Sequence, residues 1–96
     1  MIRIVKMNFK HSKVTEFLTN FEQVKERIRD FEGIEYLELL EDKSDSCIYF
    51  TYSIWQSEKH LENYRKSDLF QSIWRTTKPL FKEKAQAWSL ESLIKL

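Results

Sequence analysis

The sequence predicts an α+β protein, with one antiparallel four-stranded sheet that carries its helices on one face. Three observations support this prediction. Four segments rich in β-branched and aromatic residues recur along the 96-residue chain, as expected for strands. One long segment between the first two has apolar residues at three- and four-residue steps, the period of a helix. Shorter helical segments separate the last two strands, so the order is β-α-β-β-α-β, the split-βαβ or ferredoxin-like arrangement.

The first strand is predicted over Ile2–Phe9 (IRIVKMNF), which is β-branched and partly alternating. A long amphipathic helix follows it. Ser12 is placed to cap this helix, because its hydroxyl accepts a hydrogen bond from a free backbone N–H. Gly33 is the residue expected to make the left-handed turn after the helix. The apolar stripe of the helix consists of Val14, Phe17, Leu18, Phe21, Val24, Ile28 and Phe31.

The second and third strands, Ile34–Glu41 and Cys47–Trp55, are expected to form a hairpin around the turn DKSDS. Ser57 is placed to cap a short helix that runs to Lys66 and turns Leu61 and Tyr64 inward.

A further helical segment follows, capped by Ser67 or Asp68 and stopped or redirected by Pro79. The last strand is predicted over Ala85–Leu93.

The third strand has two unlike faces. We expect the residues Ile48, Phe50, Tyr52 and Ile54 to face the helices. The free face would then carry Cys47, Tyr49, Thr51, Ser53 and Trp55. Apolar residues also occur on both faces of the second and last strands, and helices on one side cannot cover both.

Because apolar burial stabilises by about 25 cal/mol per Å², this apolar free face predicts a partner. We expect a homodimer, sheet against sheet with two-fold symmetry. A pocket is expected in the space between the two sheets.

Composition excludes several classes of protein. Sixteen basic and fifteen acidic residues give a net charge of +1 without a basic patch, which argues against nucleic-acid binding. No apolar run approaches the length of a membrane helix, about 20 residues, and the N-terminus lacks the features of a signal peptide. The single cysteine, Cys47, suits a reducing cytoplasm. We therefore expect one cytoplasmic domain over residues 1–96 that binds neither nucleic acid nor membrane.

The stretch FTYSIWQSEKHLENYRKSDLFQSIWRTTKPLFKEKAQAWSLE resembles the antibiotic biosynthesis monooxygenase (ABM) domain family. The shared pattern is a strand that ends in Trp, then Ser-Glu, the helix HLENYRKSDLF and a final strand that opens with AW. The front half of the chain fits the same family. The resemblance implies a ferredoxin-like protomer that dimerises through its sheets into an α+β barrel.

The resemblance also implies chemistry without a metal or other cofactor. Electron-rich phenols such as anthrones and quinols pass an electron to oxygen once they are deprotonated, so the protein orients the ring and excludes water. The family places an Asn near the end of the first strand and a Trp at the end of the third in such pockets. Asn8 and Trp55 match them here and are the candidate catalytic residues.

Candidate substrate-binding residues are Tyr49, Ser53, His60 and Trp74. Each also has a structural interpretation: cross-strand packing for Tyr49 and Ser53, a solvated first helical turn for His60, and core packing for Trp74. No His, Cys or carboxylate stands at metal-ligand spacing from His11 or His60, so no metal site is predicted.

Two other functions remain open. One is a dimeric ligand-binding or stress-related module of the same fold with no chemistry of its own, since the sequence shows no strong acid–base pair. The other is haem degradation. The haem-degrading branch of the family places a His ligand four residues after the Phe of KSDLF. Trp74 stands there in this chain, and an indole does not ligate iron.

Overall fold

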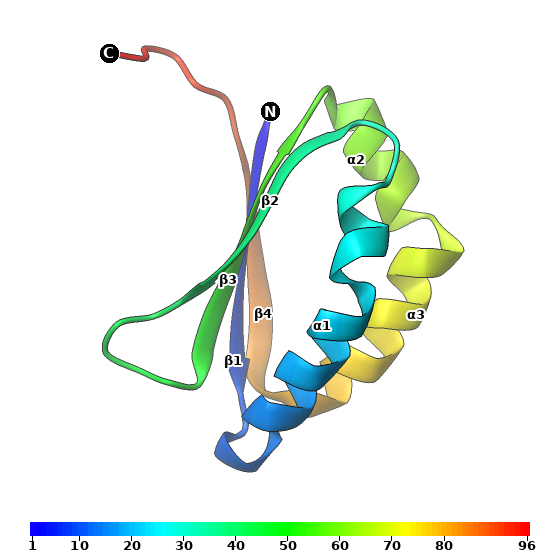
Figure 1. Ribbon diagram of the computed structural model, residues 1–96. Helices are drawn as coiled ribbons and strands as arrows, with labels where there is room; N and C mark the ends of the chain where they lie inside the picture. The colour runs from blue at the N-terminus through cyan, green and yellow to red at the C-terminus, as the bar shows by residue number, and fades with distance from the viewer.

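The protein is described over residues 1–96 by a computed structural model. The strands are β1 (Ile2–Phe9), β2 (Ile34–Glu41), β3 (Ile48–Trp55) and β4 (Phe81–Leu90). The helices are α1 (Val14–Arg29), α2 (Glu58–Arg65) and α3 (Asp68–Thr77), with short 3₁₀ turns η1 (His11–Lys13) and η2 (Lys78–Leu80). The strands form one antiparallel sheet in the order β2-β3-β1-β4. All three helices cover one face of it and none covers the other, which confirms the predicted fold (Figure 1).

The predicted last strand, Ala85–Leu93, is wrong at both ends, because β4 begins at Phe81 and stops at Leu90. The charged run Lys82-Glu83-Lys84 reads as a loop in the sequence. It lies instead on an edge strand whose only neighbour is β1. Its side chains are exposed, and charges of this kind are usual on the open edge of a sheet.

Two of the three predicted helix caps are confirmed. The Ser57 hydroxyl accepts from the backbone N–H of His60 at 3.2 Å, and that of Ser67 from Phe70 at 3.1 Å. The predicted Ser12 cap is wrong, because Ser12 lies inside η1 and α1 starts two residues later without any side-chain cap. The backbone N–H of Lys13 donates to the carbonyl oxygen of Lys10 at 2.8 Å and closes the η1 turn. Ser12 is therefore part of this turn and does not stand at the start of α1.

The predicted faces of β3 are exchanged. Tyr49, Ser53 and Trp55 are buried against the helices, at 5%, 6% and 2% exposure. Ile48, Phe50, Tyr52 and Ile54 therefore point to the side that no helix covers. The face with fewer aliphatic residues is the inner one, where Tyr49 packs in a cluster with Phe17 of α1, and Trp55 with Ile28 of α1 and Leu61 of α2.

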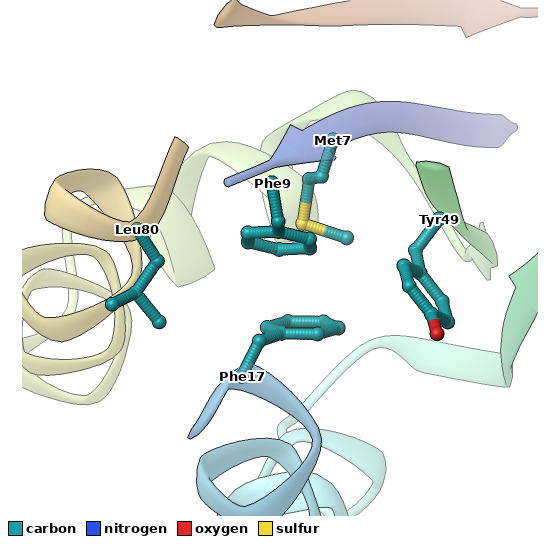
Figure 2. Packing of buried hydrophobic residues seen from close by; sticks show 5 residues of the cluster. All are labelled: Met7, Phe9, Phe17, Tyr49 and Leu80. Atoms are coloured by element: carbon teal, nitrogen blue, oxygen red, sulfur yellow. The ribbon is translucent and has the colours of Figure 1, made fainter. Parts of the chain in front are cut away.

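The core consists of two clusters between the sheet and the helices. In the first, the Phe9 and Phe17 rings stack with centroids 4.1 Å apart, and Tyr49 lies beside both. Figure 2 shows this stack with Met7 and Leu80 around it. The second cluster joins the end of β3 to α1 and α2 through Ile28, Trp55, Leu61 and Tyr64.

The uncovered face of the sheet carries large apolar side chains in contact with solvent. Tyr36, Leu40, Trp88 and Leu90 are each between 39% and 46% exposed. The expectation that both faces of the sheet are apolar is therefore confirmed. None of the three helices has the combination of length and apolar character that crossing a membrane requires.

Candidate functional site

A cavity of about 950 Å³ lies between the inner face of the sheet and the helices. Hydrophobic residues make up 17 of the 30 that line it, and every strand and helix contributes some of them. This space lies within one protomer, and it is distinct from the pocket expected between two sheets, which stays a prediction. The cavity is open to solvent in part, and exposed Ala87 on β4 is among its lining residues. An apolar hollow of this size accommodates a small organic molecule.

Trp55 lines this cavity from the end of β3, but its own helices cover most of its ring. The ring is tilted by 31° against Tyr64, with centroids 5.2 Å apart. Its Nε1–H donates to the Ser53 hydroxyl at 3.0 Å. Trp55 was expected on the free face of the third strand, but Ile28, Leu61 and Tyr64 of the same chain cover it instead.

A polar row crosses the inner face of the sheet next to Trp55. Arg3 on β1 lies between Ser53 on β3 and Ser89 on β4 in the strand register. The Arg3 Nη1 donates to the Ser89 hydroxyl at 3.0 Å, and Ser53 donates to the Arg3 carbonyl oxygen at 3.4 Å. Arg3 and Ser53 line the cavity, which is therefore polar at this end.

Arg65, in the last turn of α2, also lines the cavity. Burial lowers the pKa of Arg3, the positive charge of Arg65 lowers it further, and Glu62 acts in the opposite direction. The cavity thus has two neighbouring guanidinium groups. Sequence reasoning did not identify either one. The sequence does indicate the inward direction of Arg3, because successive side chains of a strand point to opposite faces. Arg3 therefore shares a face with the apolar residues Val5, Met7 and Phe9.

Burial raises the pKa of the Tyr64 hydroxyl to about 12. Tyr64 lines the cavity from α2 and is 8% exposed. Its hydroxyl therefore stays neutral at physiological pH. It can serve a ligand as a hydrogen-bond donor but not as a base.

Trp74 lines the cavity from α3, as a half-buried residue. Its ring stacks on Phe70, with centroids 5.9 Å apart and a 10° angle between planes. It also meets the edge of Phe81 at 5.5 Å. Of the six predicted site residues, Ser53, Trp55 and Trp74 share this cavity.

The other three predicted site residues do not line the cavity. Tyr49 belongs to the first core cluster, where burial raises the pKa of its hydroxyl. His60 packs over Gly33, and its Nδ1 lies 2.7 Å from the Ser57 hydroxyl. Asn8 pairs with Ile48 on the uncovered side of the sheet, at the end of β3 opposite to Trp55. The structure therefore does not bring Asn8 and Trp55 together.

No group of three or more His, Cys, Asp or Glu side chains converges in the structure. The one contact between a histidine and the cysteine, Cys47 Sγ to His11 Nδ1 at 3.7 Å, lies on the exposed surface.

Comparison with known proteins agrees with this fold. Among solved structures, a conserved protein of Methanosarcina mazei is 23% identical with a TM-score of 0.84, over 90% of this chain and 86% of that one. A candidate antibiotic biosynthesis monooxygenase of Nitrosomonas europaea is 15% identical with a TM-score of 0.89, over 97% and 98%. Another from Caulobacter crescentus has the same identity and score, over 97% and 89%. These similarities show a shared fold. The chain matches no curated protein.

A family model matches the sequence itself. The model described as antibiotic biosynthesis monooxygenase aligns with residues 1–76, which include β1 to β3, α1, α2 and nearly all of α3. The matched part contains Arg3, Ser53, Trp55, Arg65 and Trp74, the cavity residues described above. The chain therefore belongs to the antibiotic biosynthesis monooxygenase family.

Proposed function

We propose that the protein is a monooxygenase that oxidises a small aromatic molecule of the anthrone or hydroquinone type, without a bound cofactor. The observation that carries this proposal is the cavity of about 950 Å³ in a chain of this family. Its walls are mostly apolar, and the Trp55 and Trp74 rings are part of them. Such walls bind a flat aromatic ring and keep water away from it.

An anthrone supplies the electrons for this reaction itself. Loss of a proton from its CH₂ group to solvent leaves an enolate, which transfers an electron to O₂. The resulting radicals combine to form a C–O bond and a peroxide anion, which takes up a proton to become a hydroperoxide. The hydroperoxide then loses water as its O–O bond and the remaining C–H bond break. One oxygen atom stays in the product as a ketone and the other leaves as water. The protein's part is to orient the ring, exclude water and stabilise the enolate oxygen.

Oxygen uptake with a panel of anthrones and hydroquinones tests the proposal. We expect turnover by the wild type, and a loss of about tenfold in kcat/KM for Trp74→Leu and for Trp55→Phe, because each alters the cavity wall. Trp88→Phe is the matched control, since Trp88 lies on the other face of the sheet. Absence of uptake with every substrate, or equal rates in all variants, would contradict the proposal.

Asn8 remains a predicted catalytic residue by its match to the family pattern, and the same assay includes it. Its place on the uncovered side of the sheet gives it no access to the cavity within one protomer. Unchanged turnover in Asn8→Ala would remove Asn8 from the proposed site and leave the cavity as its location.

A second candidate is a ligand-binding module of the same fold without chemistry. The observation in its favour is that both donors are already in use: Trp55 Nε1–H donates to the Ser53 hydroxyl, and the Ser53 O–H donates to the Arg3 carbonyl oxygen, so neither is free to stabilise an oxyanion. On this alternative, aromatic ligands quench tryptophan fluorescence, whereas oxygen uptake stays at the rate of the buffer.

We also propose that the protein is a homodimer that pairs through its uncovered sheet faces. The exposed side chains Tyr36, Leu40, Trp88 and Leu90 lie on that face, and a second copy covers them by two-fold symmetry. Sedimentation at micromolar concentration tests this, and a monomer mass would contradict it. The proposal includes a cytoplasmic location, which cell fractionation tests.

A further inference from the structure

We propose that Arg3 and Arg65 form an anion-binding subsite at one end of the cavity, so that its ligand is an aromatic molecule with an ionised group. That group is a carboxylate or an ionised phenol or enol. The inference rests on the proposed function in that both use the same cavity. It concerns binding, however, and is independent of whether oxygen reacts there.

The first observation is the position of Arg3. It is half-buried on the inner face of β1, in line with Val5 and Met7, which also line the cavity. Its side chain has one hydrogen bond, to the neutral Ser89 hydroxyl at 3.0 Å, and takes part in no ion pair. A guanidinium has five N–H donors, so most of those on Arg3 have no protein partner.

The second observation is a shortage of negative charge. Arg65 approaches Glu62 at 3.9 Å, and Lys66 approaches the same carboxylate at 3.9 Å. Both contacts are long, and the side chains are well exposed, so each contributes little. One carboxylate therefore contacts two other cations, and it acts on Arg3 from a distance without forming an ion pair with it.

The third observation is that the two guanidinium groups repel each other. Burial and the charge of Arg65 both lower the pKa of Arg3. A charge that loses water and faces a like charge is costly unless an anion compensates for it. An anion that contacts both groups gains charge-assisted hydrogen bonds, and the planar fork of arginine suits a carboxylate or an oxyanion.

The rest of the cavity determines the remainder of the ligand. Away from Arg3, the wall includes the rings of Phe70, Trp74 and Phe81. A molecule that fits both regions has a flat apolar body and an anionic end. The enolate of the proposed reaction has this form, and so does a simple aromatic acid.

Titration calorimetry with a naphthoate and the matching uncharged naphthamide tests the inference without any turnover. We expect the wild type to bind the naphthoate more tightly. Arg3→Met and Arg65→Met should each weaken naphthoate binding about tenfold, since a hydrogen bond to a charged group contributes that much. Naphthamide binding should be unchanged in both variants.

The control variant is Arg75→Met, which removes the same charge from an exposed position on α3 outside the cavity. Glu62→Gln should strengthen naphthoate binding about two- to fivefold, because it removes a competing carboxylate. Arg3→Lys keeps the charge and serves as the conservative variant where Arg3→Met does not fold.

Each outcome decides the inference. Tighter naphthoate binding that depends on Arg3 and Arg65 supports it, whether or not oxygen uptake is observed. Equal binding of naphthoate and naphthamide, or an equal loss in Arg75→Met, overturns the subsite and leaves the cavity as a neutral aromatic site. If neither compound binds, the inference is overturned together with the use of the cavity.

Discussion

At the scale of single residues, Gly33 has two independent reasons to be glycine. Its φ is +93°, a region that other residues adopt only with strain. A Cβ at this position would also overlap the ring of His60 on α2. The sequence predicts the left-handed turn, but the overlap depends on where α2 returns over the end of α1.

Gly33→Ala should therefore lower the free energy of unfolding by about 2 kcal/mol or more, because backbone strain and steric overlap add. Urea denaturation measures this. The Cβ of His60 is among the overlapping atoms, as well as its ring, so His60→Gly is the variant that removes the overlap. Compared with His60→Gly alone, the double variant should show only the part due to φ. If Gly33→Ala has the same free energy of unfolding as the wild type, neither the backbone angle nor the overlap requires a glycine here.

Tyr64 predicts a dependence of stability on alkaline pH. Its pKa is raised from about 10 in the unfolded chain to about 12 in the folded protein by burial. Between these values the folded state holds a proton that the unfolded state has lost. Tyr64 therefore contributes its full stabilisation below pH 10, and that contribution falls as the pH rises through this window, by up to about 2.7 kcal/mol.

Tyr64→Phe is the matched variant, because it keeps the ring and has no group to ionise. Urea denaturation of both proteins at pH 8 and at pH values above about 10 isolates this effect from other titrations. We expect the wild type to lose more stability than Tyr64→Phe over that interval. Parallel loss in the two proteins would mean that the hydroxyl titrates normally.

The candidate site shows what single residues reveal before a structure is known. Trp55 was found because it matches the Trp that the family places at the end of the third strand, and Trp74 because it stands where the haem-degrading branch has its His ligand. Arg3 was missed because a charge in a first strand is ordinarily assigned to solvent. Its strand parity with Val5, Met7 and Phe9 indicated the inward direction, and the pairing of β1 with β3 and β4 establishes it.

At the scale of elements, the helix caps supply a prediction with an internal control. Ser57→Ala and Ser67→Ala should each cost about 1 kcal/mol of stability, because each leaves a helix N–H without its partner. Ser12→Ala should cost little, since Ser12 caps no helix. Thermal or urea unfolding of the three variants checks this. Equal costs at all three positions would contradict the assignment of the caps.

Strand boundaries and strand faces differ in how far they can be predicted. β1 and β2 match their predicted ranges, because turn residues and a helix bound them closely. β4 does not match, since charges on an edge strand have the composition of a loop. The faces of β3 were exchanged because each alternating set carries two aromatic rings and the inner set also includes the polar residues Thr51 and Ser53, so alternation alone favours the wrong face. Packing against α1 and α2 decides which face is buried, and that information is not local.

At the scale of the whole molecule, all helices lie on one side, so the protomer has an inner and an outer apolar surface (Figure 1). The inner surface surrounds the cavity. The outer one is the proposed dimer interface, and nothing from the same chain covers it. Ligand binding and association therefore use opposite faces of one sheet. A variant of the outer face should change association and leave the cavity residues in place.

The final prediction uses this separation. If the outer face pairs two copies, the midpoint of thermal unfolding should rise with protein concentration, because association stabilises the folded state by mass action. Trp88→Glu places a charge on that face and should give a monomer whose unfolding midpoint no longer depends on concentration. Leu18→Glu is the matched control: Leu18 is 39% exposed, close to the 42% of Trp88, but lies on α1. It should leave sedimentation unchanged. Equal effects of the two substitutions would show that association, if present, does not use the sheet face.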